Sequence, residues 1–291
     1  MQMGLDNQLE ITSFSHSAQR GLKWPGHHEF KQGLNLIRGG NATGKTSLAI
    51  CIFKVFSPEK EEKHFRFMER FDNNENPSLS QSKIEFTIGE NRMMIQRAIQ
   101  NNHTIGIKIT NKSTGEKLYG INALTELRKY EKPILAISSA TGPAISLIFR
   151  TVDRSANSKM GALVTNWARM LMITTPRIFV NSDGEWFCDD GWERLSLVNG
   201  RYHYALRNTG LNMLLILAQA TMRKRIKGSC PPIVCDREMF QGSSRTALLD
   251  LLKGVTEEEG LQLLLVDGRR KIDLQNINTI TLFDDSEEIW E

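Results

Sequence analysis

The sequence predicts an α/β domain, and two observations carry this prediction. A short apolar stretch at residues 34–38 (LNLIR) runs directly into a glycine-rich segment, as a buried strand before a tight loop does. Further along, the apolar stretches 233–236 (IVCD) and 261–266 (LQLLLV) alternate with segments of helical pattern at 211–226 and 244–253. Alternating strands and helices are typical of parallel pairing in a buried sheet. We therefore expect a mostly parallel core sheet in which the strands of residues 34–38 and 233–236 lie side by side.

An antiparallel part is expected beside this core. Three consecutive stretches alternate apolar and polar residues and are joined by the turn segments Gly-Glu-Asn and Gln-Asn-Asn-His. They are residues 83–88 (KIEFTI), 92–99 (RMMIQRAI) and 104–110 (TIGIKIT). Residues 9–14 (LEITSF) predict a first strand. Residues 83–110, together with the region 1–30, therefore predict an antiparallel subdomain.

The middle of the chain predicts a lobe of mainly helical character. Residues 121–130 indicate a short helix, and residues 177–199 indicate a hairpin around Ser182, Asp183 and Gly184. Residues 57–82 and the acidic tail are polar and predict exposed segments. We expect a single domain over residues 1–291, with approximate lobes at 1–120, 121–200 and 201–291.

Composition narrows the class of protein. Hydrophobic residues make up 40% and charged residues 24% of the 291 residues, which is ordinary for a globular chain. The net charge of +4 permits a nucleic-acid partner without requiring one. The four cysteines form no CxxC pair and predict free thiols rather than a zinc site. No signal peptide and no apolar run of membrane-spanning length is evident, so we expect a soluble cytoplasmic protein that does not bind membranes.

A phosphate-binding loop is the most specific motif in the sequence. The pattern G-x-x-x-x-G-K-S/T is matched at every fixed position, and a strand precedes it while an apolar helix follows. In such a loop, successive backbone N–H groups and the positive end of the helix bind phosphates. Lys45 would reach the β- and γ-phosphates of ATP, and the Thr46 hydroxyl would ligate Mg²⁺. The predicted nucleotide-binding residues are Gly39, Gly40, Asn41, Ala42, Thr43, Gly44, Lys45, Thr46 and Ser47.

The surroundings of this loop resemble one branch of P-loop NTPases. The stretch GLNLIRGGNATGKTSL is similar to the Walker A region of the RecF/SMC branch of ABC-type ATPases, and the meander that follows ends at Arg97, as it does there. The segment LRNTGLN followed by MLLILA resembles the signature motif of that family. The resemblance implies that Asn208, which replaces the usual Ser, and Gly210 contact the γ-phosphate of ATP held by the opposite protomer.

The resemblance extends to Walker B and then departs from the pattern. Asp236 ends the stretch PIVCD and would hold Mg²⁺ through water. The family places a glutamate directly afterwards, where this chain has Arg237, and Glu238 follows one position later. The family also ends its next strand with a switch histidine, where this chain has Asp267 and Gly268. Asp236 and Glu238 are therefore the candidate catalytic residues, and slow hydrolysis is expected.

Two functions of different classes fit these motifs. The first is an ATPase head that dimerises on ATP and acts on DNA or on a companion protein such as a nuclease or effector, in DNA repair or in defence against phage. The second is a hydrolysis-deficient, nucleotide-gated interaction module. A small-molecule kinase fits less well, because it has no use for the signature-like helix.

Two basic clusters bear on DNA as a partner. Each either contacts nucleic-acid phosphates or forms a solvated, charged segment, of which the second is commoner. They comprise Arg223, Lys224, Arg225 and Lys227 after the signature helix, and Arg269, Arg270 and Lys271 after the last core strand.

Overall fold

The protein folds as two compact units that are interleaved along the chain. Unit 1 consists of Met1–Leu135, Pro231–Arg237 and Gln262–Glu291, and unit 2 consists of Ala136–Cys230 and Glu238–Leu261. The prediction of a single domain stays a prediction. Among the helices of the described residues, none has the length and apolarity to span a membrane. The computed structural model describes residues 8–17, 22, 25–40, 43–57, 80–100, 103–137, 154–171, 177–180, 186–189, 194–196, 211–236, 244–267 and 276–282.

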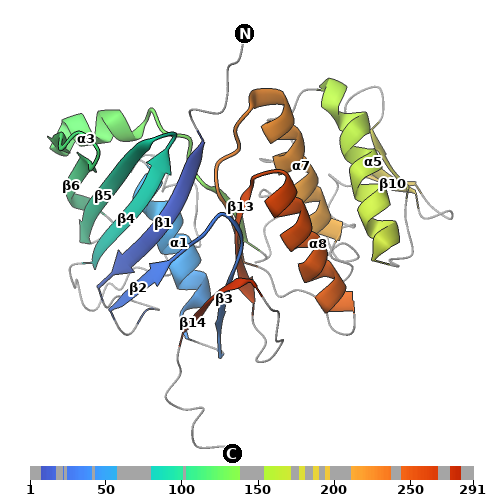
Figure 1. The fold of residues 1–291 in the computed structure, drawn as a ribbon, viewed down its shortest axis with the longest axis horizontal. Coiled ribbons are helices and arrows are strands. Elements are labelled where there is room, and N and C mark those ends of the chain that lie inside the picture. The colour runs from blue at the N-terminus through green and yellow to red at the C-terminus, as the bar shows by residue number, and fades with distance from the viewer. Residues whose placement is uncertain are drawn as a thin grey trace, which may run out of the picture. The chain divides into compact units, whose positions relative to one another are not determined.

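Unit 1 contains a six-stranded antiparallel sheet with the strand order β2-β1-β4-β5-β6-β7 (Figure 1). The sheet confirms the predicted meander and the predicted first strand, and a register shift between Ile11 and Ser13 interrupts the pairing of β1 with β4. The strands are β1 (Leu9–His16), β2 (Gly26–Glu29), β4 (Ser80–Ile88), β5 (Asn91–Gln100), β6 (His103–Asn111) and β7 (Lys117–Tyr119).

Alternation along these strands decides which face is buried. On β4, Ile84 and Phe86 are buried, whereas Lys83 and Glu85 between them point to the other face. The β4–β5 turn uses Gly89 with φ of 56°, a left-handed conformation that glycine adopts without steric cost. Strand β4 thus contributes one apolar row to the core and one polar row to the outer face.

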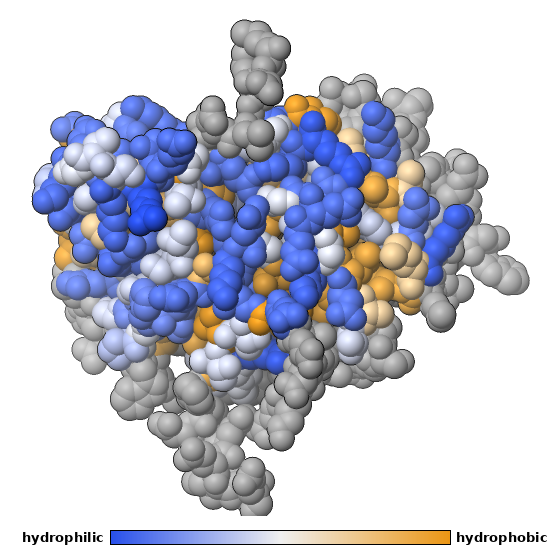
Figure 2. All heavy atoms as spheres, viewed as in Figure 1, coloured by the Kyte–Doolittle hydropathy of each residue, from blue (hydrophilic) through white to orange (hydrophobic). Residues whose placement is uncertain are grey.

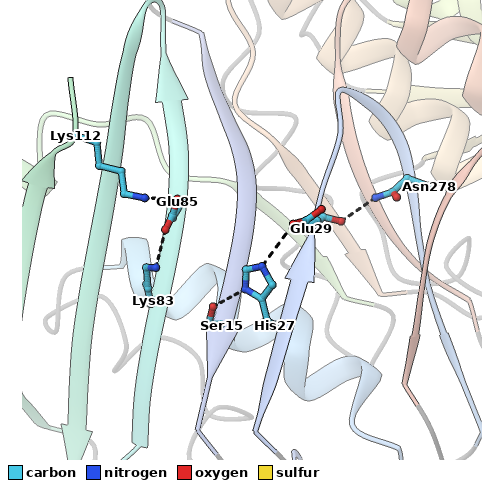
Figure 3. Close-up of polar contacts among 7 residues, drawn as sticks. All are labelled: Ser15, His27, Glu29, Lys83, Glu85, Lys112 and Asn278. Carbon is cyan, nitrogen blue, oxygen red and sulfur yellow. Dashed lines mark hydrogen bonds and ion pairs between the residues drawn. The ribbon is translucent and has the colours of Figure 1, made fainter.

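The outer face of this sheet is polar. Figure 2 shows that hydrophilic residues dominate the surface over β4, β5 and β6. The Glu85 carboxylate accepts hydrogen bonds from Lys83 and Lys112, each at 2.6 Å (Figure 3). Exposed ion pairs of this kind add little stability, so the buried apolar face holds the sheet in place.

A second sheet in unit 1 carries the core strands in the order β14-β3-β13-β12-β8. The pairs β14–β3, β3–β13 and β13–β12 are parallel, which confirms a mostly parallel core sheet. The strand of residues 34–38 and the strand of residues 233–236 do not lie side by side, and that prediction is wrong. The strands are β3 (Gly33–Gly39), β8 (Ile134–Ile137), β12 (Ile233–Asp236), β13 (Gln262–Asp267) and β14 (Asn278–Leu282).

The reason for this difference is that β13 lies between β3 and β12 and pairs with both. All six residues of β13 are buried, and β3 and β12 are also strongly apolar. When a strand is buried on both faces, its sequence does not indicate which other strand it pairs with. Local pattern therefore predicted the strands but not their order.

Helix α1 (Lys45–Phe56) packs into the core of unit 1. Its buried residues Leu48, Ile52 and Phe56 belong to one apolar cluster with inward-facing side chains of both sheets. Phe56 also meets the Phe86 ring edge-on, with 5.3 Å between the ring centroids. The helix predicted over residues 47–56 is confirmed and begins two residues earlier. Both sheets thus share a core with this helix.

The expected helical lobe at residues 121–200 divides between the two units. Helix α3 (Gly120–Leu127) belongs to unit 1, whereas α5 (Arg154–Met170) belongs to unit 2. Unit 2 also holds an antiparallel sheet in the order β11-β10-β9, so strands accompany the helices in this segment. The pairing of β9 with β10 confirms the predicted hairpin, although its turn lies outside the described residues. The strands are β9 (Arg177–Val180), β10 (Trp186–Asp189) and β11 (Arg194–Ser196).

Two further helices complete unit 2. Helix α7 (Leu211–Lys227) confirms the helix predicted after Gly210, and α8 (Ser244–Glu258) confirms the one predicted at residues 244–253. In α7 the side chains of Leu214, Leu217 and Ala218 are fully buried. Helix α7 packs against α5 within this unit. Buried apolar side chains thus hold the helices of unit 2 together.

Candidate nucleotide site

The loop between β3 and α1 has the geometry of an anion-binding helix start. Gly44 caps α1 with φ of 94°, a left-handed conformation suited to glycine. Within the described residues, no side chain caps this end and its first turn holds no acidic residue. The first helical hydrogen bond runs from Leu48 N to Gly44 O at 2.8 Å. The N–H groups of the first turn are therefore available to an anion, as helix N-termini generally allow.

Lys45 lies folded over this loop. Its Nζ donates a hydrogen bond to Gly39 O at 2.8 Å and a second one to Gly40 O. Thr43 Oγ1 also donates to Gly40 O, at 3.0 Å. Both lysine partners are neutral carbonyls, whereas a phosphate oxygen carries charge and makes the stronger, charge-assisted bond. A bound phosphate would therefore compete successfully for the Lys45 ammonium group.

Gly39 is required at the end of β3 for steric reasons. A Cβ atom at this position would lie 2.5 Å from Thr43 Oγ1 and 2.6 Å from the carbonyl oxygen of Leu282 on β14. The second neighbour is backbone, which cannot move aside without breaking the pairing of β14 with β3. The first glycine of the motif thus allows close packing of loop and sheet.

The structure describes some of the remaining Walker A residues but not all of them. Thr46 is partly exposed in the first turn of α1, and Ser47 beside it is buried with 5% exposure. Asn41 and Ala42 lie outside the described residues. Thr46 therefore has the accessibility that a metal-ligating hydroxyl needs.

The carboxyl ends of the parallel strands meet at the edge of the sheet where this loop begins. Asp236 ends β12 in register with Val266, and Asp267 ends β13 in register with Arg38 on β3. The backbone thus brings the predicted Walker B aspartate to the same sheet edge as Walker A, with β13 between the two. The side chain of Asp236 and the whole of Glu238 lie outside the described residues.

Asp267 and Arg38 form a charged pair that the sequence analysis missed. Arg38 Nε lies 3.5 Å from Asp267 Oδ2, and the Asp267 side chain is only 5% exposed. Parallel register places the two side by side directly before the glycine-rich loop. A signal was present in the sequence, because each residue directly precedes a glycine at the end of an apolar strand. Only the pairing of β3 with β13 brings them together.

Arg97 on β5 fixes the other end of α1. The side chain is 2% exposed, and its Nη1 donates hydrogen bonds to the carbonyl oxygens of Lys54 and, at 2.6 Å, Ser57. Its Nε donates to Thr104 Oγ1 at 2.8 Å. A cation at a helix C-terminus satisfies carbonyls that lack helical partners and interacts favourably with the helix dipole. The arginine that ends the predicted meander therefore holds the P-loop helix against the antiparallel sheet.

The signature residues are not part of this described geometry. Asn208 and Gly210 lie outside the described residues, and α7, which follows them, belongs to unit 2. Unit 1 alone brings together Gly39, Gly44, Lys45, the backbone of Asp236 and the pair of Asp267 with Arg38.

Comparison with known proteins points to one fold. No protein-family model matches the chain, and no curated protein sequence matches it. An SMC head bound to the C-winged helix domain of ScpA is similar in structure, with a TM-score of 0.58 and 14% identity over 89% of each chain. RecF with ATP is similar with a TM-score of 0.55 and 13% identity, over 95% of this chain and 98% of that one.

A third similar structure is an SMC head domain with an extended coiled coil from Pyrococcus furiosus, bound to the C-terminal domain of ScpA. Its TM-score is 0.52 with 12% identity, over 90% of each chain. The similarity to all three extends over most of the chain, whereas the identity is low, so it is a likeness of fold. The chain therefore has the fold of SMC heads and RecF.

Proposed function

We propose that this protein binds ATP with Mg²⁺ at the P-loop of unit 1. The observation that carries the proposal is the uncapped N-terminus of α1 with Lys45 folded over the loop. Backbone N–H groups and one ammonium group lie together there, and these are the donors that bind phosphates. A similar solved structure is described as RecF with ATP, which supports the same nucleotide here.

Mg²⁺ would be held by two residues in this proposal. Thr46 directly follows Lys45 and would offer its hydroxyl oxygen, and Asp236 at the end of β12 would act through water. Both are oxygen donors, which Mg²⁺ prefers, and the ion keeps several waters in such sites. Residues 39–47 and Asp236 thus make up the proposed site for Mg²⁺-ATP.

The second part of the proposal is an ATP-dependent homodimer. Asn208 and Gly210 stand before α7, where the family resemblance assigns contacts with ATP of the opposite protomer. Such closure is favoured only while the γ-phosphate is present, which makes nucleotide the switch. The dimer would act on DNA or on a companion effector protein, in DNA repair or defence. Two similar structures are SMC heads described as bound to ScpA domains, which supports a protein partner.

Arg237 favours a second candidate function. It directly follows Asp236, where an acceptor would be needed to orient the attacking water, and arginine has no acceptor. Asp267 stands near the position of the switch histidine and is engaged with Arg38. On this alternative, the chain is a nucleotide-gated interaction module with little hydrolysis, and turnover assays separate the two functions.

Replacement of Lys45 tests nucleotide binding. Lys45→Ala removes a charge-assisted contact with the phosphates, so ATP affinity should fall about 10- to 100-fold. Titration with a fluorescent ATP analogue gives the affinity, and circular dichroism verifies folding. Lys54→Ala is the matched control, because Lys54 lies in the last turn of the same helix, and its affinity should stay unchanged. Unchanged affinity in folded Lys45→Ala protein would exclude this site.

A further inference from the structure

Two histidines of the β1–β2 hairpin meet on one face of the antiparallel sheet. His16 on β1 is in register with Gly26 on β2, and His28 follows two residues later on the same face. Because glycine has no side chain opposite His16, the His28 ring can lean diagonally across the pair. The Nε2 atoms of His16 and His28 lie 3.2 Å apart. This spacing is close to the roughly 3.4 Å that two imidazoles span on one tetrahedral ion with bonds of about 2.05 Å.

The orientation of His16 is fixed from its other nitrogen. Nδ1 lies 3.1 Å from the carbonyl oxygen of Ser17, which can only accept, so Nδ1 carries the proton. In the neutral ring, Nε2 then carries no proton, and its lone pair can coordinate a metal ion. A ring nitrogen held by a backbone carbonyl is the usual support of metal-binding histidines. Phe14, with its ring centroid 5.6 Å from that of His16, forms an apolar wall beside the ring.

Gly26 lies beside both of these ring nitrogens. A Cβ atom built there would be 2.7 Å from His16 Nε2 and 2.8 Å from His28 Nε2. The absence of a side chain at Gly26 thus allows the two nitrogens to approach each other. Neutral imidazole is the form that binds metal ions.

We propose that His16 and His28 form a two-histidine site for a divalent transition-metal ion such as Zn²⁺. Imidazole nitrogen suits Zn²⁺, Ni²⁺ and Cu²⁺, whereas Mg²⁺ and Ca²⁺ prefer oxygen. Among the described residues, no group of three or more His, Cys, Asp or Glu side chains gathers as ligands, so water completes the coordination. The ion would link β1 to β2, the edge strand that leads into the Walker A strand. This site is independent of the proposed nucleotide function.

The test uses nucleotide-free full-length protein and Zn²⁺. Isothermal titration calorimetry should detect one saturable site per chain, and Zn²⁺ should raise the Tm whereas Mg²⁺ should not. His16→Ala and His28→Ala should each weaken this site at least about tenfold. The matched control is His27→Ala, since His27 lies on the opposite face, where it contacts Ser15 Oγ at 2.8 Å and Glu29 (Figure 3). His27→Ala should leave the affinity unchanged.

A second variant keeps the test decisive if a histidine variant fails to fold. Gly26→Ala retains both histidines, but its methyl carbon would lie 2.7 Å from His16 Nε2 and 2.8 Å from His28 Nε2, so the rings must move and the site should be lost. Circular dichroism without metal verifies the fold of each variant. The proposal is overturned if wild-type protein shows no saturable Zn²⁺ site, if folded His16→Ala or His28→Ala binds normally, or if His27→Ala loses binding equally. The two rings would then share only an N–H···N hydrogen bond.

Discussion

At the scale of single residues, Arg97 combines deep burial with hydrogen bonds from its Nε and Nη1 atoms. Its guanidinium group meets the carbonyls of Lys54 and Ser57 at the end of α1, and Thr104 on the neighbouring strand. A buried cation is tolerated because these acceptors replace its water. The P-loop helix is thereby held at its C-terminus, opposite the end proposed to bind phosphate.

Arg97→Met should destabilise unit 1 by about 2–4 kcal/mol, because it keeps the volume but leaves the carbonyls of Lys54 and Ser57 without this donor. Urea unfolding followed by circular dichroism measures the change. Arg92→Met, an exposed arginine on the same strand, is the control and should change stability by no more than about 0.5 kcal/mol. Equal stability of the two variants would show that the hydrogen bonds of Arg97 to the end of α1 do not stabilise the protein.

Arg237 should limit hydrolysis. It is always protonated and has no acceptor, so it cannot orient the attacking water. We expect wild-type turnover well below about 1–100 s⁻¹, the typical range for phosphoryl transfer by kinases. Arg237→Glu should raise the rate, which steady-state phosphate release measures. A normal wild-type rate that Glu238→Gln abolishes would contradict this prediction and identify Glu238 as the base.

At the scale of elements, Gln262 joins the two sheets of unit 1. Its Oε1 accepts from Ile11 N at 2.8 Å, and its Nε2 donates to Ile11 O at 2.7 Å and to Lys31 O at 3.1 Å. The amide thus pairs with Ile11 as a neighbouring strand would, at the point where β1 shifts register with β4. Gln262 is 1% exposed and Ile11 is fully buried, so the backbone groups of Ile11 have no water to replace this amide.

Gln262→Leu should therefore destabilise the protein by about 1–3 kcal/mol, because it leaves the buried N–H of Ile11 unsatisfied. Thermal and urea unfolding measure the loss. The matched control is Gln96→Leu on β5, where the glutamine is exposed, and its effect should stay within about 0.5 kcal/mol. If both variants lost the same stability, the hydrogen bonds between Gln262 and Ile11 would contribute nothing beyond an exposed glutamine.

A second amide strengthens the same junction. Asn35 on β3 is fully buried; its Oδ1 accepts from Lys31 N and from Asn278 Nδ2, each at 2.8 Å. Asn278 also donates to the backbone oxygen of Glu29 on β2 at 2.9 Å (Figure 3). The strands that begin the parallel sheet are thus tied by side-chain amides to the edge of the antiparallel one. Such satisfied polar networks favour one arrangement of the sheets over others.

At the scale of the whole molecule, the central prediction is a symmetric dimer that forms with ATP and not with ADP. Light scattering with Mg²⁺ and each nucleotide measures the shift. Gly210→Glu should block dimerisation, because a carboxylate would face the γ-phosphate at close range. Gly254→Glu is the control, since Gly254 on α8 is exposed with no atom near its missing Cβ. The proposed ATP-dependent dimer would be contradicted if the protein stayed monomeric at high concentration with Mg²⁺-ATP. Normal dimerisation of Gly210→Glu would contradict it as well.

Local features were predictable because their cause is local. The strand–loop–helix order around Lys45 follows from glycine spacing and flanking apolar runs, and it holds in the structure. The period-2 alternation at residues 83–88 likewise predicted a strand, and β4 covers these residues. For the same reason, Asp236 was correctly expected at the end of a buried strand, since this depends only on its own segment.

By itself the sequence determined the longer strands and helices and where a P-loop motif stands, but not the short strands β2, β7, β8 and β14. Only the tertiary structure decided that β13 separates β3 from β12, that Arg38 meets Asp267, and that His16 faces His28. The physical reason is that periodicity is set by neighbours along the chain, whereas sheet order and diagonal contacts depend on residues far apart in sequence. Uniformly apolar strands would be equally well buried in several strand orders of the sheet. Only the packing between them selects one order.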